Sequence, residues 1–248
     1  MGDIQKMNDK FLEAKERHQQ LEDTHSGIGT LGEKTLHAII KYYFEPNVEK
    51  HEIKVGRYVA DIFNEKGIVE VQTRNFAALR KKLDFFLKSY PVTIVYPVAY
   101  TKWIYWIDES TGVISKKRKS PKKGTTYCVF PELYRIKSLL SHPNLSLTIL
   151  LLDVEEYKLL NGWSEDRKKG SERYEIIPIA LIEQMSINSI KEYKKLIPKN
   201  LPDTYSSKDF KKVSGLSLPA SQTALNILNY LGVVKRIGKR GNSFLYQS

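Results

Sequence analysis

Two carboxylates on neighbouring apolar runs are the residues of this 248-residue chain whose types and spacing point most directly to chemistry. Asp61 lies in the run Tyr58–Phe63, and Glu70 lies in the run Ile68–Thr73. Residues 64–67 between the runs, Asn-Glu-Lys-Gly, are typical of a turn. If they form a hairpin loop, Asp61 faces Glu70 directly, and such like charges destabilise a sheet unless a positive charge lies between them. A divalent cation supplies that charge, since Mg²⁺ is commonly held by one or two carboxylates with water and phosphate.

The strand that carries Glu70 also determines which side chains share its face. Glu70 and Gln72 are two residues apart and point to the same side, whereas Val69 and Val71 point to the other side, into a core. This pattern predicts a metal site on a sheet, with an amide beside the two carboxylates. The alternative is that Glu70 and Gln72 line the solvent face of an exposed strand and that Asp61 is a surface residue near a turn. One hairpin register decides all three roles.

The sequence around this hairpin predicts the helices and strands that would hold it in place. Apolar residues recur at helical spacing in some segments and alternate or cluster in others. The predicted helices are residues 3–22, 31–44, 76–89, 131–140 and 187–197, and the predicted strands are residues 49–55, 58–63, 68–73, 92–95, 102–108, 147–152 and 176–182. Residues 166–173 form a predicted charged loop. Helices and strands in this order indicate an α/β fold with a mixed sheet.

The charge of the chain indicates the kind of partner that it binds. The 40 Lys and Arg residues against 28 Asp and Glu residues give a formal charge of +12, which favours association with polyanions such as nucleic acid. One cysteine, Cys128, excludes a disulfide framework and a cysteine-based zinc site. No apolar run approaches the roughly 18 residues of a membrane span, and the polar amino terminus is unlike a signal peptide. We therefore expect a soluble cytoplasmic protein with no membrane partner.

A dense basic run occupies residues 116–123, with the sequence Lys-Lys-Arg-Lys-Ser-Pro-Lys-Lys. Lys117, Arg118 and Lys119 in this run are candidate contacts to the phosphates of a nucleic acid. The alternative is a solvated loop, because basic runs are weakly specific for nucleic-acid binding. The basic character of the rest of the chain favours the first interpretation.

Residues 203–248 form a separate pattern after a linker-like stretch at 198–202, Pro-Lys-Asn-Leu-Pro. The expected elements are helices at 206–213 and 217–231 and strands at 233–237 and 242–246, with a basic hairpin tip at 238–241. This order of helix, turn, helix and hairpin resembles the winged helix-turn-helix family. The resemblance implies a small domain that binds DNA, although some members of that family bind only proteins.

The second helix of this C-terminal pattern carries amides at helical spacing on its outer face: Gln222, Asn226 and Asn229. Amide side chains are suited to hydrogen bonding with base edges in a major groove, and Lys239 and Arg240 in the hairpin tip are suited to holding phosphate. The alternative is an ordinary solvated helix face. Amides in place of the usual Lys and Glu favour contact with DNA.

The acidic hairpin and the segment before it resemble the PD-(D/E)XK nuclease superfamily. In that family, a helix precedes a hairpin that carries an acidic residue and then Glu-x-Lys, and a further helix follows. Glu33 in a Gly-x-Gly-Thr-x-Gly-Glu segment, Asp61, and Glu70-Val71-Gln72 match this order over residues 26–96. The resemblance implies a restriction-endonuclease-like nuclease domain at residues 26–198, between an N-terminal helix at 1–25 and a winged helix domain at 203–248.

The resemblance also implies a role for each residue of the motif. Asp61, Glu70 and the Val71 carbonyl would hold Mg²⁺ or Mn²⁺, with Glu33 as an accessory ligand. Glu33 has an alternative role as a first-turn carboxylate that the helix dipole favours. Gln72 would position the attacking water by hydrogen bonding.

Gln72 is the position at which this sequence departs from the family, which most often has lysine there. A neutral amide orients a water molecule but brings no positive charge to developing negative charge, so Arg74 nearby is a candidate to compensate. Two functions follow: a metal-dependent DNA endonuclease, or a catalytically inactive DNA-binding regulator with a nuclease-like domain. RNA remains an alternative substrate. Cutting both strands with one site per chain favours a homodimer.

Overall fold

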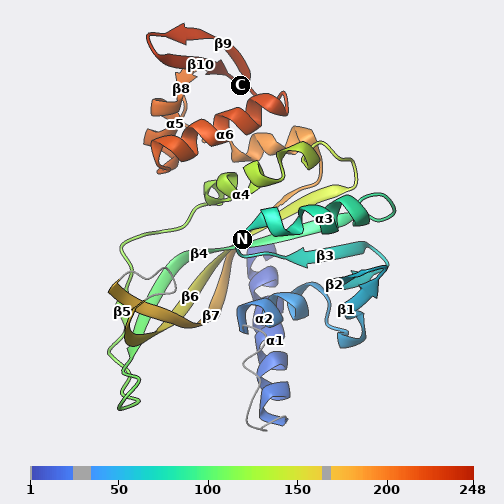
Figure 1. The fold of residues 1–248 in the computed structure, drawn as a ribbon, viewed down its shortest axis with the longest axis vertical. Coiled ribbons are helices and arrows are strands. Elements are labelled where there is room, and N and C mark those ends of the chain that lie inside the picture. The colour runs from blue at the N-terminus through green and yellow to red at the C-terminus, as the bar shows by residue number, and fades with distance from the viewer. Residues whose placement is uncertain (1, 25–34, 164–168) are drawn as a thin grey trace. The chain divides into compact units, whose positions relative to one another are not determined.

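The computed structural model describes residues 2–24, 35–163 and 169–248, in which helices and strands form a mixed α/β fold (Figure 1). The α-helices are α1 (Gly2–Thr24), α2 (Thr35–Phe44), α3 (Phe76–Phe86), α4 (Phe130–Arg135), α5 (Ser207–Ser214) and α6 (Leu218–Tyr230). The short 3₁₀ helices are η1 (Val48–Lys50), η2 (Thr126–Val129), η3 (Lys137–Leu139) and η4 (Ile190–Leu196). The strands are β1 (His51–Val55), β2 (Tyr58–Asn64), β3 (Gly67–Val71), β4 (Val92–Ile107), β5 (Arg118–Lys119), β6 (Leu145–Trp163), β7 (Lys169–Ile187), β8 (Tyr205–Ser206), β9 (Lys235–Arg240) and β10 (Ser243–Gln247).

The strands of these residues pair into two sheets. The larger sheet has seven strands in the order β1-β2-β3-β4-β6-β7, with β5 paired to β4. Within it, β2 and β3 are antiparallel whereas β3 and β4 are parallel, so the sheet is mixed. The smaller sheet is antiparallel and has the order β8-β10-β9. The expected α/β fold with a mixed sheet is confirmed.

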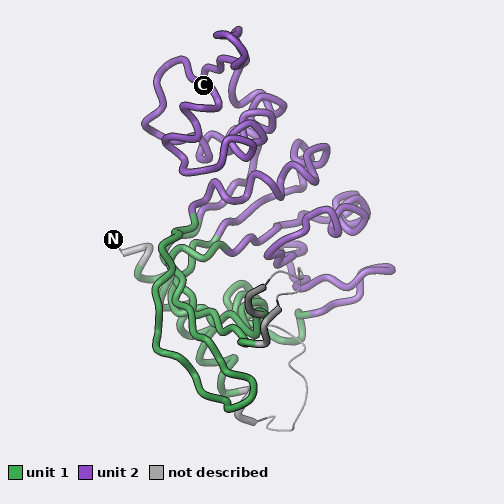
Figure 2. The backbone as a smooth tube through the Cα atoms, turned by 60° about the vertical axis from the view of Figure 1, so that its left-hand side comes forward, with its two compact units in different colours: residues 1–51, 98–124, 150–184 green, residues 52–97, 125–149, 185–248 purple. Residues whose placement is uncertain are grey.

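The chain divides into two compact units, shown in two colours in Figure 2. Unit 1 comprises residues 1–51, 98–124 and 150–184, and unit 2 comprises residues 52–97, 125–149 and 185–248. In unit 1, α1 packs on α2, and the ring centroids of Phe11 and Tyr43 lie 5.5 Å apart. Unit 2 holds the β2–β3 hairpin, α3, α4 and the C-terminal helices α5 and α6. Among the described helices, none has the length and apolarity needed to cross a membrane.

The register of the β2–β3 hairpin agrees with the prediction. Ile62 lies opposite Val69, and Phe63 lies opposite Ile68. The loop of the hairpin is shorter than expected. Asn64 pairs with Gly67, so the turn has two residues instead of four. Gly67 has a φ of 113°, and a Cβ there would overlap the carbonyl oxygen of Pro91. Glycine is therefore required at this end of the hairpin.

Strand β4 is continuous where the sequence predicts two separate strands, 92–95 and 102–108, on either side of Pro97. The parallel pairing with β3 gives the reason. The carbonyl of Pro91, just before β4, accepts a hydrogen bond from β3, and the carbonyl of Val95 accepts one from Gln72, just beyond β3. Alternate residues of a strand direct their backbone groups to the same side, so Pro91, Val95 and Pro97 all face β3. The N–H that Pro97 lacks would therefore point to that side, and it falls beyond the last pair, Val71 with Val95, where β3 has ended. The proline interrupts no pair of the ladder.

Other boundaries also differ from the sequence-based prediction. The expected helix 131–140 is α4 followed by η3, and the expected helix 187–197 is the end of β7 followed by η4. Of the charged loop expected at 166–173, residues 166–168 lie outside the described residues, and residues 169–173 lie at the start of β7. Strand β7 is the last in the order of its sheet, a place that tolerates charged residues. The basic hairpin tip expected at 238–241 is also shifted, because Lys239 and Arg240 pair with β10 and the turn lies at residues 241–242.

Candidate functional site

The β2–β3 hairpin brings Asp61 and Glu70 together in unit 2. The Val71 backbone N–H donates a hydrogen bond of 2.7 Å to Asp61 Oδ2, and the Asp61 backbone N–H donates a longer one of 3.4 Å to Glu70 Oε1. Glu70 is only 1% exposed, whereas Asp61 is half-buried. The two carboxylates are therefore held by each other's strand, and one of them is removed from water.

Lys82 on α3 supplies the positive charge that such a pair requires. Its Nζ lies 2.5 Å from Glu70 Oε2, and its side chain is 18% exposed. From the sequence, a divalent cation is expected in this role, and Lys82 is not among the predicted site residues. A signal was present, because Lys82 stands at helical spacing among the buried residues Leu79, Leu83 and Phe86. A lysine on the buried stripe of a helix indicates a buried partner for its ammonium group.

The environment of Glu70 raises its pKa to about 7, from an ordinary value of 4.5. Burial is the largest cause, and the neighbouring charge of Asp61 adds to it. The ammonium of Lys82 acts in the opposite direction and does not fully offset these two effects. Glu70 therefore exchanges its proton near neutral pH, unlike an ordinary surface glutamate.

Gln72 follows the last residue of β3, where the strand was expected to continue to Thr73. Its backbone N–H bonds to the Val95 carbonyl at 2.9 Å, which fixes the main chain at this point. Its side-chain Nε2 donates to the backbone carbonyl of Arg74, so the carboxamide is oriented by the segment that leads into α3. Arg74 itself is exposed.

The donor set at the hairpin consists of two carboxylates and the backbone carbonyl of Val71. In the described parts of the chain, no three or more His, Cys, Asp or Glu side chains cluster as metal ligands. Mg²⁺ is commonly held by one or two carboxylates with water and substrate phosphate, so the donors fit such an ion in kind and number. An ion there would share Glu70 with the ammonium of Lys82. Glu33, the predicted accessory ligand, lies outside the described residues.

The basic run 116–123 lies in unit 1 and contains the short strand β5 in place of an uninterrupted loop. Lys119 pairs with Trp103 of β4, and its Nζ lies 5.3 Å from the centre of that ring. Lys117 Nζ forms an ion pair of 2.7 Å with Glu155, and Arg118 is exposed. The charge of Lys117 is thus partly balanced inside the protein, while Arg118 and Lys119 remain accessible to a polyanion.

The C-terminal helices begin and end at residues suited to those positions. The Ser206 hydroxyl accepts from the N–H of Asp209, whose carboxylate accepts in return from the N–H of Ser206. Gly215 ends α5 in a left-handed conformation with a φ of 73°. Ser217 then opens α6, where its side chain accepts from the N–H of Ala220. These caps define two short helices as the sequence predicts.

The amides on the outer face of α6 differ in their contacts. Gln222, Asn226 and Asn229 are all exposed. Asn226 Oδ1 accepts a 2.8 Å hydrogen bond from Lys137 Nζ, and Asn229 Oδ1 accepts one of 3.0 Å from the backbone N–H of Arg236. Two of the three amides therefore also hold neighbouring segments of unit 2.

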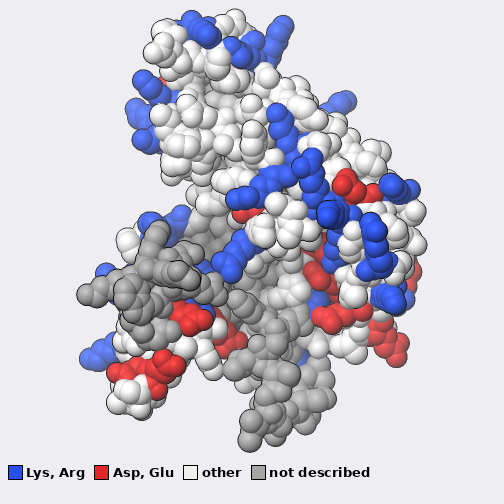
Figure 3. Space-filling model, in the orientation of Figure 1, with Lys and Arg blue, Asp and Glu red and all other residues white. Residues whose placement is uncertain are grey.

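Strand β9 is exposed along its whole length, and Figure 3 shows basic side chains over β9 and β10. Lys239 Nζ lies 4.9 Å from the ring centre of Phe244 on β10, which is a cation–π contact. Arg240 Nη2 lies 3.7 Å from Asp209 Oδ2, and 72% of the Arg240 side chain is exposed to solvent. The two residues predicted to hold phosphate thus lie on an exposed strand instead of in the hairpin tip.

Comparison with known proteins gives a family but no described activity. The family model described as Domain of unknown function (DUF8091) matches residues 34–188. An uncharacterized protein of Treponema pallidum (strain Nichols) is 31% identical over 228 residues, which cover 89% of this chain and 87% of that protein. No solved structure matches the chain. The segment matched by the family model includes the hairpin and Lys82 and ends before α5 and α6.

Proposed function

We propose that this chain, which belongs to the DUF8091 family of domains of unknown function, is a metal-dependent DNA endonuclease of the PD-(D/E)XK type. The observation that carries the proposal is the cluster of Asp61, Glu70 and Lys82. Two carboxylates and one ammonium meet at the end of a hairpin, and the nearly buried carboxylate has a pKa of about 7. Perturbed ionisable groups gathered in this way are typical of catalytic sites.

The residues of the chain divide the chemistry among them. Asp61, Glu70 and the Val71 carbonyl would hold the metal. When bound, Mg²⁺ or Mn²⁺ would lower the pKa of a coordinated water and stabilise negative charge on the scissile phosphate. The Gln72 carboxamide, which Arg74 orients, would position the water.

Lys82 has the charge that Gln72 lacks. Arg74, the residue expected from the sequence to compensate, is exposed, whereas Lys82 contacts the Glu70 carboxylate directly. A preorganised ammonium beside the reacting phosphate stabilises developing negative charge more strongly in a partly buried site than in water. Lys82 is therefore our candidate for the role that the family's motif lysine has at the position of Gln72.

The C-terminal elements would engage the DNA. Strand β8, helices α5 and α6 and the β9–β10 hairpin follow one another in the order of a winged helix. Gln222 and Asn226 on α6 would contact base edges, and Lys239 and Arg240 on β9 would contact phosphate. Arg118 and Lys119 on β5 would add phosphate contacts from unit 1.

Cleavage of supercoiled plasmid DNA tests the proposal. We expect nicking in Mg²⁺ or Mn²⁺ and none in EDTA. Asp61→Asn keeps an acceptor for the Val71 N–H, so it should preserve the fold and DNA binding while lowering the cleavage rate by at least about 100-fold. Asp84→Asn, which changes an exposed aspartate on α3, is the matched control and should cut normally. Unchanged cleavage by Asp61→Asn would refute the site.

Lys82 is tested in the same assay. We expect Lys82→Met to lower the cleavage rate by about 100- to 1,000-fold, the range observed when one preorganised donor is removed from a catalytic site. Lys81→Met, at the exposed neighbouring position, should have no effect. Equal rates for the two variants would show that Lys82 has no part in the reaction.

The second candidate is a catalytically inactive DNA-binding regulator, and the Lys82–Glu70 contact favours it. Since Lys82 already forms an ion pair with the buried Glu70 carboxylate, one of the two negative charges is balanced without a metal. This candidate predicts salt-sensitive DNA binding with no cleavage in any divalent metal. It also predicts that Asp61→Asn leaves every measured property of DNA binding unchanged.

A further inference from the structure

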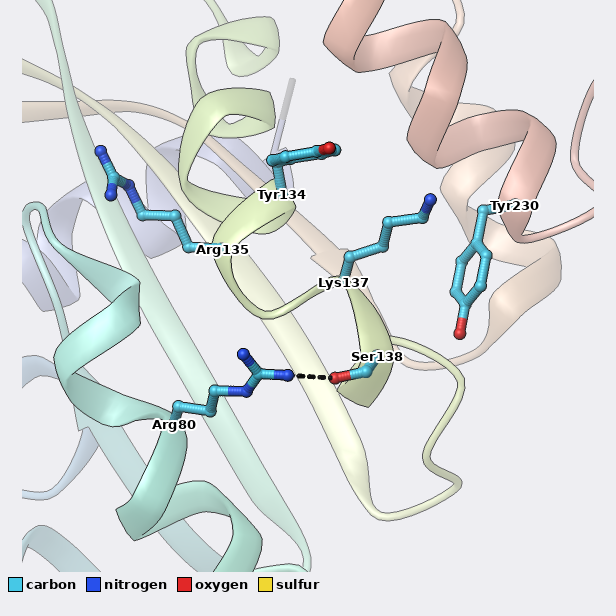
Figure 4. A pocket seen from close by; sticks show the side chains of 6 residues that line it. All are labelled: Arg80, Tyr134, Arg135, Lys137, Ser138 and Tyr230. Carbon is cyan, nitrogen blue, oxygen red and sulfur yellow. Dashed lines mark hydrogen bonds between the residues drawn. The ribbon is translucent and has the colours of Figure 1, made fainter.

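A cavity of about 340 Å³ in unit 2 has neither Asp61 nor Glu70 in its lining (Figure 4). Its lining comes from α3, from the α4–η3 segment and from the end of α6: Arg80, Tyr134, Arg135, Lys137, Ser138 and Tyr230. The volume is near the lower end of the roughly 300–1,000 Å³ typical of sites for small molecules. The cavity therefore has room for a group of about the size of one nucleotide.

Three cations line this cavity, and none of its lining residues is acidic. Arg80 Nη2 donates a hydrogen bond of 3.1 Å to Ser138 Oγ, which positions the guanidinium (Figure 4). Lys137 Nζ is held between Asn226 Oδ1 at 2.8 Å and the Tyr230 ring at 4.4 Å. Arg135 has Glu132 at 3.6 Å on the neighbouring turn, and its side chain is more than half exposed. The charge of the cavity favours an anion.

Two tyrosine rings form the apolar part of the same cavity. Tyr134 is 53% exposed and Tyr230 is 48% exposed, so both rings offer surface to a ligand. The ammonium of Lys137 lies 6.0 Å from the centre of the Tyr134 ring and 4.4 Å from that of Tyr230. Accessible aromatic rings interleaved with cations are the arrangement by which proteins stack the bases of a single strand and hold its phosphates. A base inside a duplex is covered by its neighbours on both faces, so these rings can stack only on an unpaired base.

We propose that this cavity binds an unpaired nucleotide of a DNA strand, with its base against Tyr134 or Tyr230 and its phosphates against Arg80, Arg135 and Lys137. Figure 3 shows basic side chains gathered over α3 and α4, the elements that supply three of the six lining residues. The choice of DNA as the polymer rests on the proposed function. The inference deepens that function by specifying a substrate with a single-stranded segment, such as a flap, a gap or an overhang.

Binding of a fluorescein-labelled 12-nucleotide oligo-dT to the full chain, measured by anisotropy in EDTA, tests this proposal. Loss of one stacked base weakens single-strand binding by roughly 5- to 150-fold, so we expect Tyr134→Ala or Tyr230→Ala to raise Kd by a factor in this range. The Tyr→Phe variants keep the rings and should bind like the unchanged protein. Tyr174→Ala, at an exposed tyrosine on β7 in unit 1, is the matched control and should also bind normally.

An oligonucleotide of the same length with abasic sites distinguishes stacking from phosphate binding. We expect the unchanged protein to bind the abasic oligonucleotide at least about 5-fold more weakly than oligo-dT. Both Tyr→Ala variants should bind the abasic oligonucleotide with the same affinity as the unchanged protein does. Equal affinity for the two oligonucleotides, or Tyr→Ala variants that bind oligo-dT normally, would overturn the proposal. Because the assay contains no metal, its outcome is separate from that of the cleavage assay. A protein that binds oligo-dT by stacking but cuts no DNA would refute the proposed nuclease activity and would leave this nucleotide site standing.

Discussion

Replacing Glu70 with glutamine should stabilise the protein at pH 8, although Glu70 is nearly buried and bonded to Lys82. The fold raises the pKa of Glu70 from 4.5 to about 7, chiefly by burial, so folding favours its protonated form. The stabilisation from this neutral form is complete below pH 4.5 and is lost as the pH rises through 7. Since a tenfold change in proton affinity corresponds to about 1.4 kcal/mol, the ionised carboxylate costs about 3 kcal/mol at pH 8. Glutamine resembles the neutral acid and removes that cost.

Glu156 provides the matched control with the opposite sign. It is equally buried, at 2% exposure, but Lys102 Nζ and Arg173 Nε each lie 2.8 Å from its carboxylate. Burial raises its pKa, yet the bond and charge of Lys102 and the charge of Arg173 outweigh burial and hold the pKa below its usual value. The ionised form is therefore favoured by folding, and its contribution is lost as the pH falls. Glu156→Gln should destabilise the protein at pH 8 by about 2 kcal/mol, a typical value for hydrogen bonds to a charged group.

The assay is urea unfolding followed by circular dichroism in EDTA, at pH 5 and at pH 8. We expect Glu70→Gln to raise the free energy of unfolding by about 3 kcal/mol at pH 8 and by less than about 1 kcal/mol at pH 5, where the unchanged protein is largely protonated at this residue. Glu156→Gln should lower the free energy at pH 8. If Glu70→Gln is destabilising at both pH values, the Lys82 contact outweighs burial, and the reasoning is wrong.

Three further predictions concern other features of the molecule. Mn²⁺ at 100 times its Kd should raise the free energy of unfolding at pH 8 by about 2.7 kcal/mol. The same Mn²⁺ concentration should raise it less at pH 6, where Glu70 is largely protonated, and should not stabilise Glu70→Gln. Equal metal stabilisation of Glu70→Gln and the unchanged protein would refute the ligand assignment. Changing both Lys239 and Arg240 to alanine should weaken DNA binding and reduce the magnitude of its log–log salt slope by about 1.8, and an unchanged slope would indicate that β9 contacts protein. Gly67→Ala should lower the free energy of unfolding by more than about 3 kcal/mol in a urea or thermal melt, because strain at a φ of 113° adds to overlap with the Pro91 carbonyl. Gly112→Ala, with a φ of 69° and open space around it, should lower it by only about 1 kcal/mol, and similar losses for the two variants would contradict the close approach of Gly67 to Pro91.

The hairpin was predictable because its signals are local. Turn residues at 64–67 and apolar alternation on both sides set the register, and the structure places Ile62 opposite Val69 as expected. The approach of Asp61 to Glu70 followed from that register. Lys82 was missed because its contact with Glu70 depends on how α3 packs against the sheet, which sequence spacing does not define. Only its position on the buried stripe of α3 indicated that its ammonium needs a partner.

The length of β4 was not predictable for a related reason. A proline usually ends a strand, and whether Pro97 does so depends on which neighbour its missing N–H would face. That direction depends on the pairing with β3, and β3 ends at Val71. The charged start of β7 is similar, because residues 169–173 resemble a loop until their place on the last strand of the sheet is known.

The division of the chain has a practical consequence for experiments on fragments. Each compact unit is assembled from three separate stretches of sequence, and β4, β6 and β7 each contribute residues to both units. A single cut by a protease therefore cannot release either unit as one continuous piece, and no truncation from one end yields unit 1 or unit 2 alone. Gene fragments that begin or end near residues 97, 124, 149 or 184 should give insoluble protein. The roles of the acidic hairpin and of the cavity lined by Tyr134 and Tyr230 must therefore be tested separately, by point substitutions in the whole chain.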